Sequence, residues 1–67
     1  MIHQIVSIYD RKAEAFGKPV FVNSTGTAIR SFGDAVNDDT SEFNKHPQDY
    51  TLNHIGEWND ATAEFTF

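Results

Sequence analysis

Cysteine is absent from this 67-residue sequence, and its absence excludes disulfide bonds and thiolate zinc sites. A chain of this length buries only about 60% of the surface that its unfolded form exposes. Such a thin core usually needs a disulfide, a metal or self-association to support it. We therefore expect one domain over residues 1–67 that associates into a homodimer or another small homo-oligomer.

Long apolar runs are missing as well. No stretch approaches the roughly 18 apolar residues of a membrane span, and the first residues lack the basic start and apolar run of a signal peptide. We expect no contact with a membrane. The absence of cysteine is compatible with a reducing cytoplasm.

Positive charge is scarce, because five Lys and Arg residues stand against ten Asp and Glu residues, giving a formal net charge of −5. The charge is also uneven, since residues 31–67 hold eight of the acids and a single cation, Lys45. This balance argues against a protein that coats nucleic acid by bulk charge. It leaves room for a local basic patch within residues 1–30.

Motifs typical of enzymes are lacking too. The sequence contains no GxSxG, HExxH or P-loop pattern. His3, His46 and His54 do not have the spacing of metal ligands. We expect no catalytic residue, no metal and no cofactor.

The patterns that are present indicate four strands and one helix. Apolar, β-branched and aromatic residues mark strands at 2–10, 20–23, 50–58 and 63–67, and the charged loop 11–19 makes the first two a hairpin with a long tip. Between them, helical spacing predicts a helix at about 25–37 with Ser24 or Thr25 as N-cap, followed by a polar link at 37–47. Its apolar stripe consists of Ala28, Ile29, Phe32, Ala35 and Val36. The predicted fold is α+β, a four-stranded, mainly antiparallel sheet with one helix on a face, in the order ββαββ.

A basic loop is the best candidate for contacting nucleic acid. Arg11 and Lys12 are joined by Lys18 across the loop, and Tyr9 and Phe16 flank them. Cationic side chains hold the phosphates of a single strand, and aromatic side chains stack on its bases for about 1–3 kcal/mol each. The alternative is an ordinary solvated loop.

Three further residues have two interpretations. Arg30 could reach a phosphate, but an ion pair with Asp34 at i+4 on the same helix is favoured. Tyr50 and Trp58 have the same parity within one strand and could stack on bases, although packing in a core or an interface is favoured. Gly56 inside that strand predicts a bulge or a close backbone approach.

One helix can cover only one face of a four-stranded sheet, so apolar residues remain for the other face. Exposed apolar patches beyond a few hundred Å² usually mark an interface. The predicted oligomer interface consists of Ile5, Tyr9, Phe21, Trp58 and Phe65.

Three segments, IVSIYDRK, AIRSFGDAVND and HPQDYTLNHIGEWNDATAE, occur in this order over nearly the whole chain. Together they resemble the small nonstructural protein of gokushovirus-type microviruses, which are bacteriophages with circular single-stranded DNA genomes. The best markers are Tyr9-Asp10, Arg30-Ser31-Phe32, Val36-Asn37-Asp38, His46-Pro47 with Asp49-Tyr50, and Ile55-Gly56-Glu57 with Asn59. Relatives tend to continue beyond the last strand with a polar tail that contains Pro and Lys, whereas this sequence stops at EFTF.

The resemblance implies a non-catalytic accessory protein that acts in the cytoplasm of the host bacterium. Such a protein would bind single-stranded DNA weakly during genome replication or packaging. The alternative is a protein-interaction module that serves as a scaffold or regulator of the phage replication or capsid machinery without touching DNA.

Overall fold

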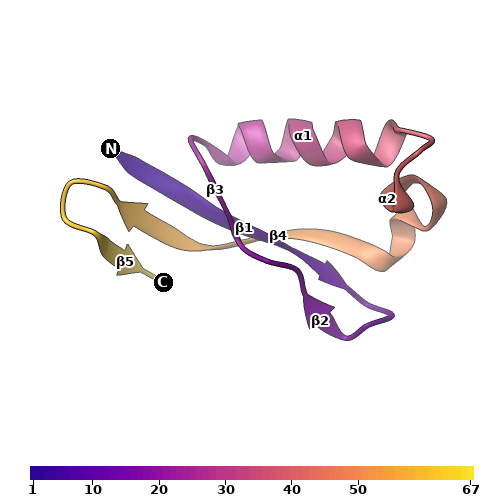
Figure 1. Cartoon of the computed structure of the whole chain (residues 1–67), viewed down its shortest axis with the longest axis horizontal. Helices are drawn as coiled ribbons and strands as arrows, with labels where there is room; N and C mark the ends of the chain where they lie inside the picture. The colour runs from indigo at the N-terminus through magenta and orange to yellow at the C-terminus, as the bar shows by residue number, and fades with distance from the viewer.

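Two long antiparallel strands form the centre of the sheet. In the computed structural model, which describes residues 1–67, β1 (Ile2–Asp10) pairs with β4 (Tyr50–Asn59) from Ile2↔Asn59 to Asp10↔Tyr50 (Figure 1). Both strands are rich in β-branched and aromatic residues, which suit a pleated, half-buried surface. This pairing runs the full length of both strands, and the other strands of the sheet add to its two edges.

Three short strands complete the sheet. β2 (Ala15–Phe16) and β3 (Val20–Val22) both pair with the free edge of β1, and β5 (Glu64–Thr66) pairs with the end of β4. The order is β2-β1-β4-β5, with β3 beside β1 and every pairing antiparallel. The predicted α+β fold and first hairpin are confirmed. The tip of this hairpin contains the additional strand β2. The sequence predicted a loop there, because Gly17 and Pro19 follow closely.

α1 (Thr25–Asn37) agrees with the predicted helix at 25–37. Ser24 is its N-cap, and the Ser24 hydroxyl oxygen accepts a 3.1 Å hydrogen bond from the Thr27 N–H. The polar link that follows is more ordered than expected, because it contains the short helix α2 (Glu42–Lys45) and the 3₁₀ helix η1 (Pro47–Asp49). Ser41 caps α2 by accepting from the Phe43 N–H, and Pro47 suits the start of η1 since it needs no backbone donor there. Neither α-helix has the length and apolar composition needed to cross a bilayer.

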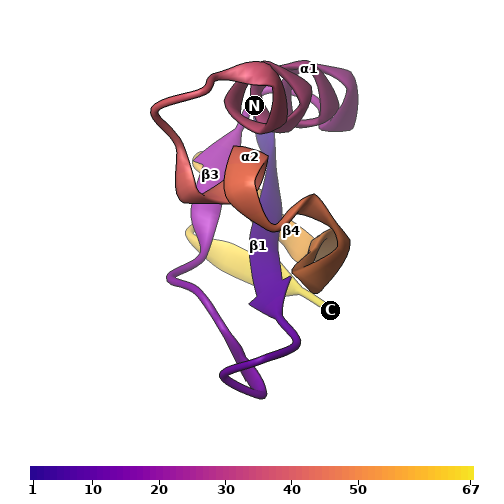
Figure 2. The ribbon, with the colours of Figure 1, turned by 90° about the vertical axis from the view of Figure 1, so that its right-hand side faces the viewer.

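α1 covers one face of the sheet, here called the helix face, and the opposite face is called the open face. Figure 2 shows α1 on one side of the strands. Ala28, Phe32 and Ala35 of the predicted stripe line the space above the helix face. Ile29, in contrast, is 63% exposed, so its assignment to the packed stripe was wrong. It lies at the edge of the stripe, beyond the reach of a sheet this narrow.

A β-bulge in β4 reverses the alternation of its side chains. The register shifts so that Val6 faces His54 while Ile5 faces Gly56, which leaves Ile55 as the extra residue. Tyr50 therefore lies on the helix face with Asp10, whereas Trp58 lies on the open face with His3. The prediction that Tyr50 and Trp58 share a face was wrong because it assumed unbroken alternation.

Gly56 is required by its surroundings, as predicted. It is buried beside the bulge, and an added Cβ would lie 2.6 Å from the Thr66 carbonyl oxygen and 2.7 Å from the Phe67 ring. These distances are shorter than any ordinary contact. Gly56 thus lets the end of the chain cross closely over β4. The buried apolar residues are only Ile5, Val6 and Ala28, so the core itself is small.

Candidate nucleic-acid interface

The open face carries aromatic side chains and no carboxylate at its strand positions. The register assigns eleven residues to it: His3, Ile5, Ser7, Tyr9, Phe16, Phe21, Thr51, Asn53, Gly56, Trp58 and Phe65. The strand acids Asp10, Glu57 and Glu64 all lie on the helix face. A polyanion that approaches the open face therefore meets rings and neutral polar groups first.

The basic hairpin, residues 9–18, projects from one end of this face. The Asp10 carboxylate accepts hydrogen bonds of 3.0 and 3.3 Å from the N–H groups of Lys12 and Ala13, which fixes the turn. At its return, the Gly17 N–H donates 2.8 Å to the Ile8 carbonyl oxygen, and the Ser7 hydroxyl donates 2.7 Å to the Gly17 carbonyl oxygen. Local hydrogen bonds thus hold the hairpin in one shape.

Tyr9 and Phe16 form an aromatic pair at the base of the hairpin. They are register partners, and their ring centroids lie 4.8 Å apart with the planes tilted by 58°. Phe16 is 57% exposed, so much of its ring is open to a ligand. The structure brings together the two aromatic residues that the sequence placed beside the cations.

The four candidate cations differ in what surrounds them. Arg11 forms an ion pair with Asp49 at 3.3 Å, yet its side chain is 67% exposed and keeps free donors. Lys12 and Lys18 are exposed and form no ion pair. Arg30 is also unpaired, so the predicted ion pair with Asp34 is wrong; an exposed helical pair contributes only about 0.2–0.5 kcal/mol, too little to hold two solvated side chains.

Arg30 belongs to α1, which covers the helix face, and it therefore does not join the basic hairpin. Lys45, the single cation of residues 31–67, lies in α2 beside η1, whose Asp49 pairs with Arg11. Figure 1 shows α2 and β2 at one end of the molecule, which measures 40 × 23 × 14 Å, and β5 at the other. The position of α2 near the hairpin depends on the contact between η1 and Arg11, which no sequence spacing predicts.

The predicted interface residues separate into three places. Phe21, Trp58 and Phe65 lie together, with ring centroids 5.5 to 6.3 Å apart, and Phe67 stacks on Phe65 at 5.9 Å. These four residues are called the aromatic cluster. Tyr9 lies at the other end of the open face. Ile5 is only 3% exposed, with Phe21 and Gly56 as its register partners, so it belongs to the interior and not to an interface.

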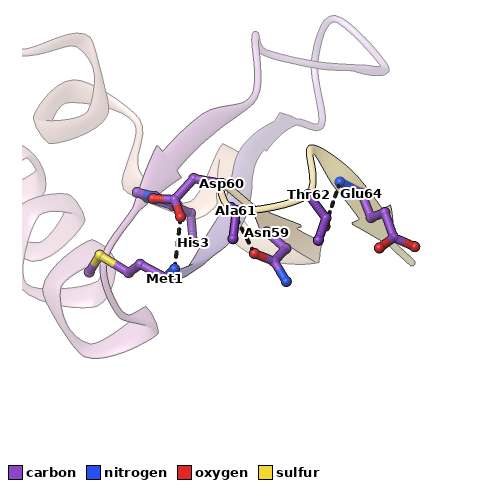
Figure 3. Close-up of polar contacts among 7 residues, drawn as sticks. All are labelled: Met1, His3, Asn59, Asp60, Ala61, Thr62 and Glu64. Atoms are coloured by element: carbon purple, nitrogen blue, oxygen red, sulfur yellow. Dashed lines mark hydrogen bonds and ion pairs between the residues drawn. The ribbon is translucent and has the colours of Figure 1, made fainter.

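A small polar network borders the aromatic cluster. The Asp60 carboxylate accepts a 2.7 Å hydrogen bond from the N-terminal ammonium of Met1 and lies 2.8 Å from Nε2 of His3 (Figure 3). The ring of His3 is 5.4 Å from that of Trp58. These hydrogen bonds, from the ammonium first and from His3 second, lower the pKa of Asp60. Asp60 is thereby kept charged at the rim of the cluster, with its carboxylate bound to the N-terminal ammonium and to His3.

The helix face contains a groove of about 700 Å³ between α1 and the strands. Ten of its sixteen lining residues are hydrophobic, among them Val6, Phe32, Phe43 and Leu52. Partial burial raises the pKa of Tyr50 at its wall, and the nearby carboxylates of Asp10, Glu42 and Asp49 add to this effect. The groove is therefore apolar with acidic groups near one wall.

The three histidines lie apart in the structure. His3 contacts Asp60, His54 lies 2.7 Å from the side-chain oxygen of Gln4, and His46 is exposed between α2 and η1. No group of three or more His, Asp or Glu residues is arranged to hold a metal ion.

Fold and site together describe a small α+β protein with one open sheet face and a basic hairpin at its end. Residues 3–67 match the profile of the family described as Phage ORF5 protein. The chain therefore belongs to the Phage ORF5 protein family, and it is a bacteriophage protein. Neither a curated protein nor a solved structure matches it significantly.

Proposed function

We propose that this protein is a non-catalytic accessory protein that binds single-stranded DNA during replication or packaging of a phage genome, in the cytoplasm of the host bacterium. We also propose that the protein is a counterpart of the small nonstructural protein of gokushovirus-type microviruses, which its sequence resembles. The observation that carries it is the Tyr9–Phe16 pair, on a sheet face with no carboxylate at its strand positions, beside Arg11, Lys12 and Lys18 in sequence.

Single-stranded DNA is the form of nucleic acid that this arrangement suits. Aromatic rings on a sheet can stack only on bases that are not already stacked in a duplex, and such stacking tolerates any sequence. The three cations can contact the phosphates on either side of a stacked base. The net charge of −5 keeps the overall attraction low, so we expect weak binding that is strongest at low salt.

Fluorescence anisotropy with a labelled oligothymidine at several salt concentrations tests the proposal. Three neutralised phosphates on a single strand give a slope of about −2 for log K against log salt. Lys12→Ala with Lys18→Ala should make the slope less steep by about 1.4. Tyr9→Ala with Phe16→Ala should weaken binding by about 1–3 kcal/mol per stacked base and leave the slope unchanged.

Arg30→Ala is the matched control, because it removes one positive charge from the helix side of the molecule. It should change neither slope nor affinity. Absence of binding at low salt, or binding that survives both double substitutions, would contradict the proposal.

The groove beneath α1 favours a second candidate function, that of a protein-interaction module in the phage replication or capsid machinery. Apolar concave surfaces of this size commonly accept the side chains of a ligand or partner. Leu52→Asp in the groove wall distinguishes the two functions. It should leave DNA binding intact if the hairpin is the site, and it should abolish function in infected cells if the groove is.

A further inference from the structure

We infer that the aromatic cluster of Phe21, Trp58, Phe65 and Phe67 is an interface for a second copy of this chain. The cluster lies at the end of the open face that is remote from the basic hairpin, and α1 cannot cover it because α1 packs on the other face. Phe21 is 46%, Phe65 53% and Phe67 87% exposed. Such a contiguous set of large exposed rings is unusual on a monomeric protein.

Nucleic acid is a poor occupant for this end of the face. Residues 46–67, which supply three of the four rings, contain no Lys or Arg. The same stretch contributes Asp60 in the turn at the rim of the cluster. A phosphate backbone laid over the cluster would find no Lys or Arg side chain in this stretch to bind it. The partner is therefore apolar where it touches the rings.

The exposed area fits a second copy of the same chain. Aromatic side chains bury about 150–250 Å² each. At the exposures above, the cluster offers on the order of 400 Å² per protomer, so two clusters with their rims approach the lower limit of about 1,200 Å² for a specific interface. A two-fold pairing is self-complementary, because it places rings against the same rings.

The charge at the rim permits this pairing. Asp60, the carboxylate linked to the cluster through His3, already binds the N-terminal ammonium and is not a free negative charge. Bringing two such rims together therefore adds little repulsion. Burial of the cluster also enlarges a core that holds only three buried apolar residues.

The arrangement leaves both basic hairpins free. Each hairpin lies at the end of its protomer away from the cluster, so pairing through the cluster does not cover it. The inference does not depend on DNA binding by the hairpin, since the mass of the particle can be measured without any DNA.

Sedimentation equilibrium over the micromolar range tests the inference. We expect the mass to rise from 7.6 kDa towards twice that value with concentration, and the melting temperature to rise with it. Phe65→Lys should weaken the association at least tenfold, because it places a charge in the contact. Phe21→Ser should do the same through a different strand, so that loss of β5 pairing alone cannot account for the result.

Ile29→Ser is the matched control. Ile29 is 63% exposed on α1 and equally apolar, but it lies away from the cluster. It should leave association unchanged, and circular dichroism should show native secondary structure for all three variants. A mass of 7.6 kDa at every concentration, or equal effects of Phe65→Lys and Ile29→Ser, would overturn the inference.

Discussion

The side chain of Arg11 and the main chain of Arg11 both bind the same distant residue, Asp49. The guanidinium lies 3.3 Å from the Asp49 carboxylate, and the Arg11 N–H donates 2.8 Å to the Asp49 carbonyl oxygen. This double link joins the basic hairpin to η1 across 38 positions of sequence. The Asp49 side chain is only 8% exposed, so its charge depends on Arg11 for compensation.

We expect Arg11→Ala to lower the free energy of unfolding by about 1 kcal/mol, because it leaves a buried carboxylate without its cation. Lys12→Ala also removes one positive charge, but Lys12 has no ion-pair partner. This substitution should change the free energy of unfolding by less than about 0.5 kcal/mol. Urea denaturation of both variants measures the difference. Equal stability of the two would show that the ion pair contributes nothing.

Gly56→Ala should be among the most damaging small substitutions in the protein. The new methyl group would meet the Thr66 carbonyl oxygen at 2.6 Å, and β5 would have to move. Overpacking of this kind costs about 1–3 kcal/mol. Gly33→Ala, where nothing lies within 4 Å, should instead stabilise α1 by about 1 kcal/mol. Thermal unfolding followed by Trp58 fluorescence checks both, and a harmless Gly56→Ala would disprove the close approach.

Two turns of the sheet are built alike and share one weakness. Asp10 and Asn59 each accept a backbone N–H two residues onward, and the turns end at Glu14 and Ala63 with φ of 55° and 62°. A residue with a Cβ in this left-handed region destabilises the fold by about 1 kcal/mol, whereas glycine adopts the region without this cost. Ala63→Gly should therefore raise the free energy of unfolding by up to about 1 kcal/mol.

Ala61→Gly is the control for that turn, since Ala61 has no positive φ and gains only chain entropy in the unfolded state. It should be neutral or destabilising in the same denaturation experiment. If both glycines act in the same direction, backbone strain at residue 63 is not the cause.

Acid should weaken the network around Asp60. Its folded pKa is lowered by the N-terminal ammonium and His3, so the stability that it contributes is present above the ordinary Asp pKa, near about 4. That stability is lost as the pH falls through the lowered folded pKa. The stability of the wild type relative to Asp60→Asn should therefore shrink below about pH 4. Since Asp38, also with a lowered pKa, is present in both proteins, its effect cancels.

Local patterns made much of the fold predictable. The helix at 25–37 follows from its cap and spacing, and the first hairpin follows from adjacent strands with a charged loop between them. The aromatic pair and the cations of the basic hairpin were readable for the same reason, because all lie within ten residues, 9–18. Local sequence determines which residues share a short hairpin.

Non-local relationships were not predictable in this way. The bulge at Ile55 depends on how β4 pairs with β1, so alternation alone wrongly placed Tyr50 and Trp58 on the same face. The partner of Arg11 lies far along the chain, and the absence of a partner for Arg30 reflects solvation, which no spacing rule records. Ile29 shows that an apolar residue at helical spacing stays exposed where the sheet below is too narrow.

The pairing of β1 with β4 also sets the order in which the molecule can fold. The β1–β2 and β4–β5 hairpins close over short turns, a process of about 1–10 μs. The central pairing joins strands from the two ends of the sequence and must overcome the entropy of closing the long loop between them. During synthesis, β1 and the basic hairpin emerge well before residues 50–59. Until β4 follows, the inner edge of β1 has no partner, so the nascent chain is most exposed to wrong strand pairing during that interval.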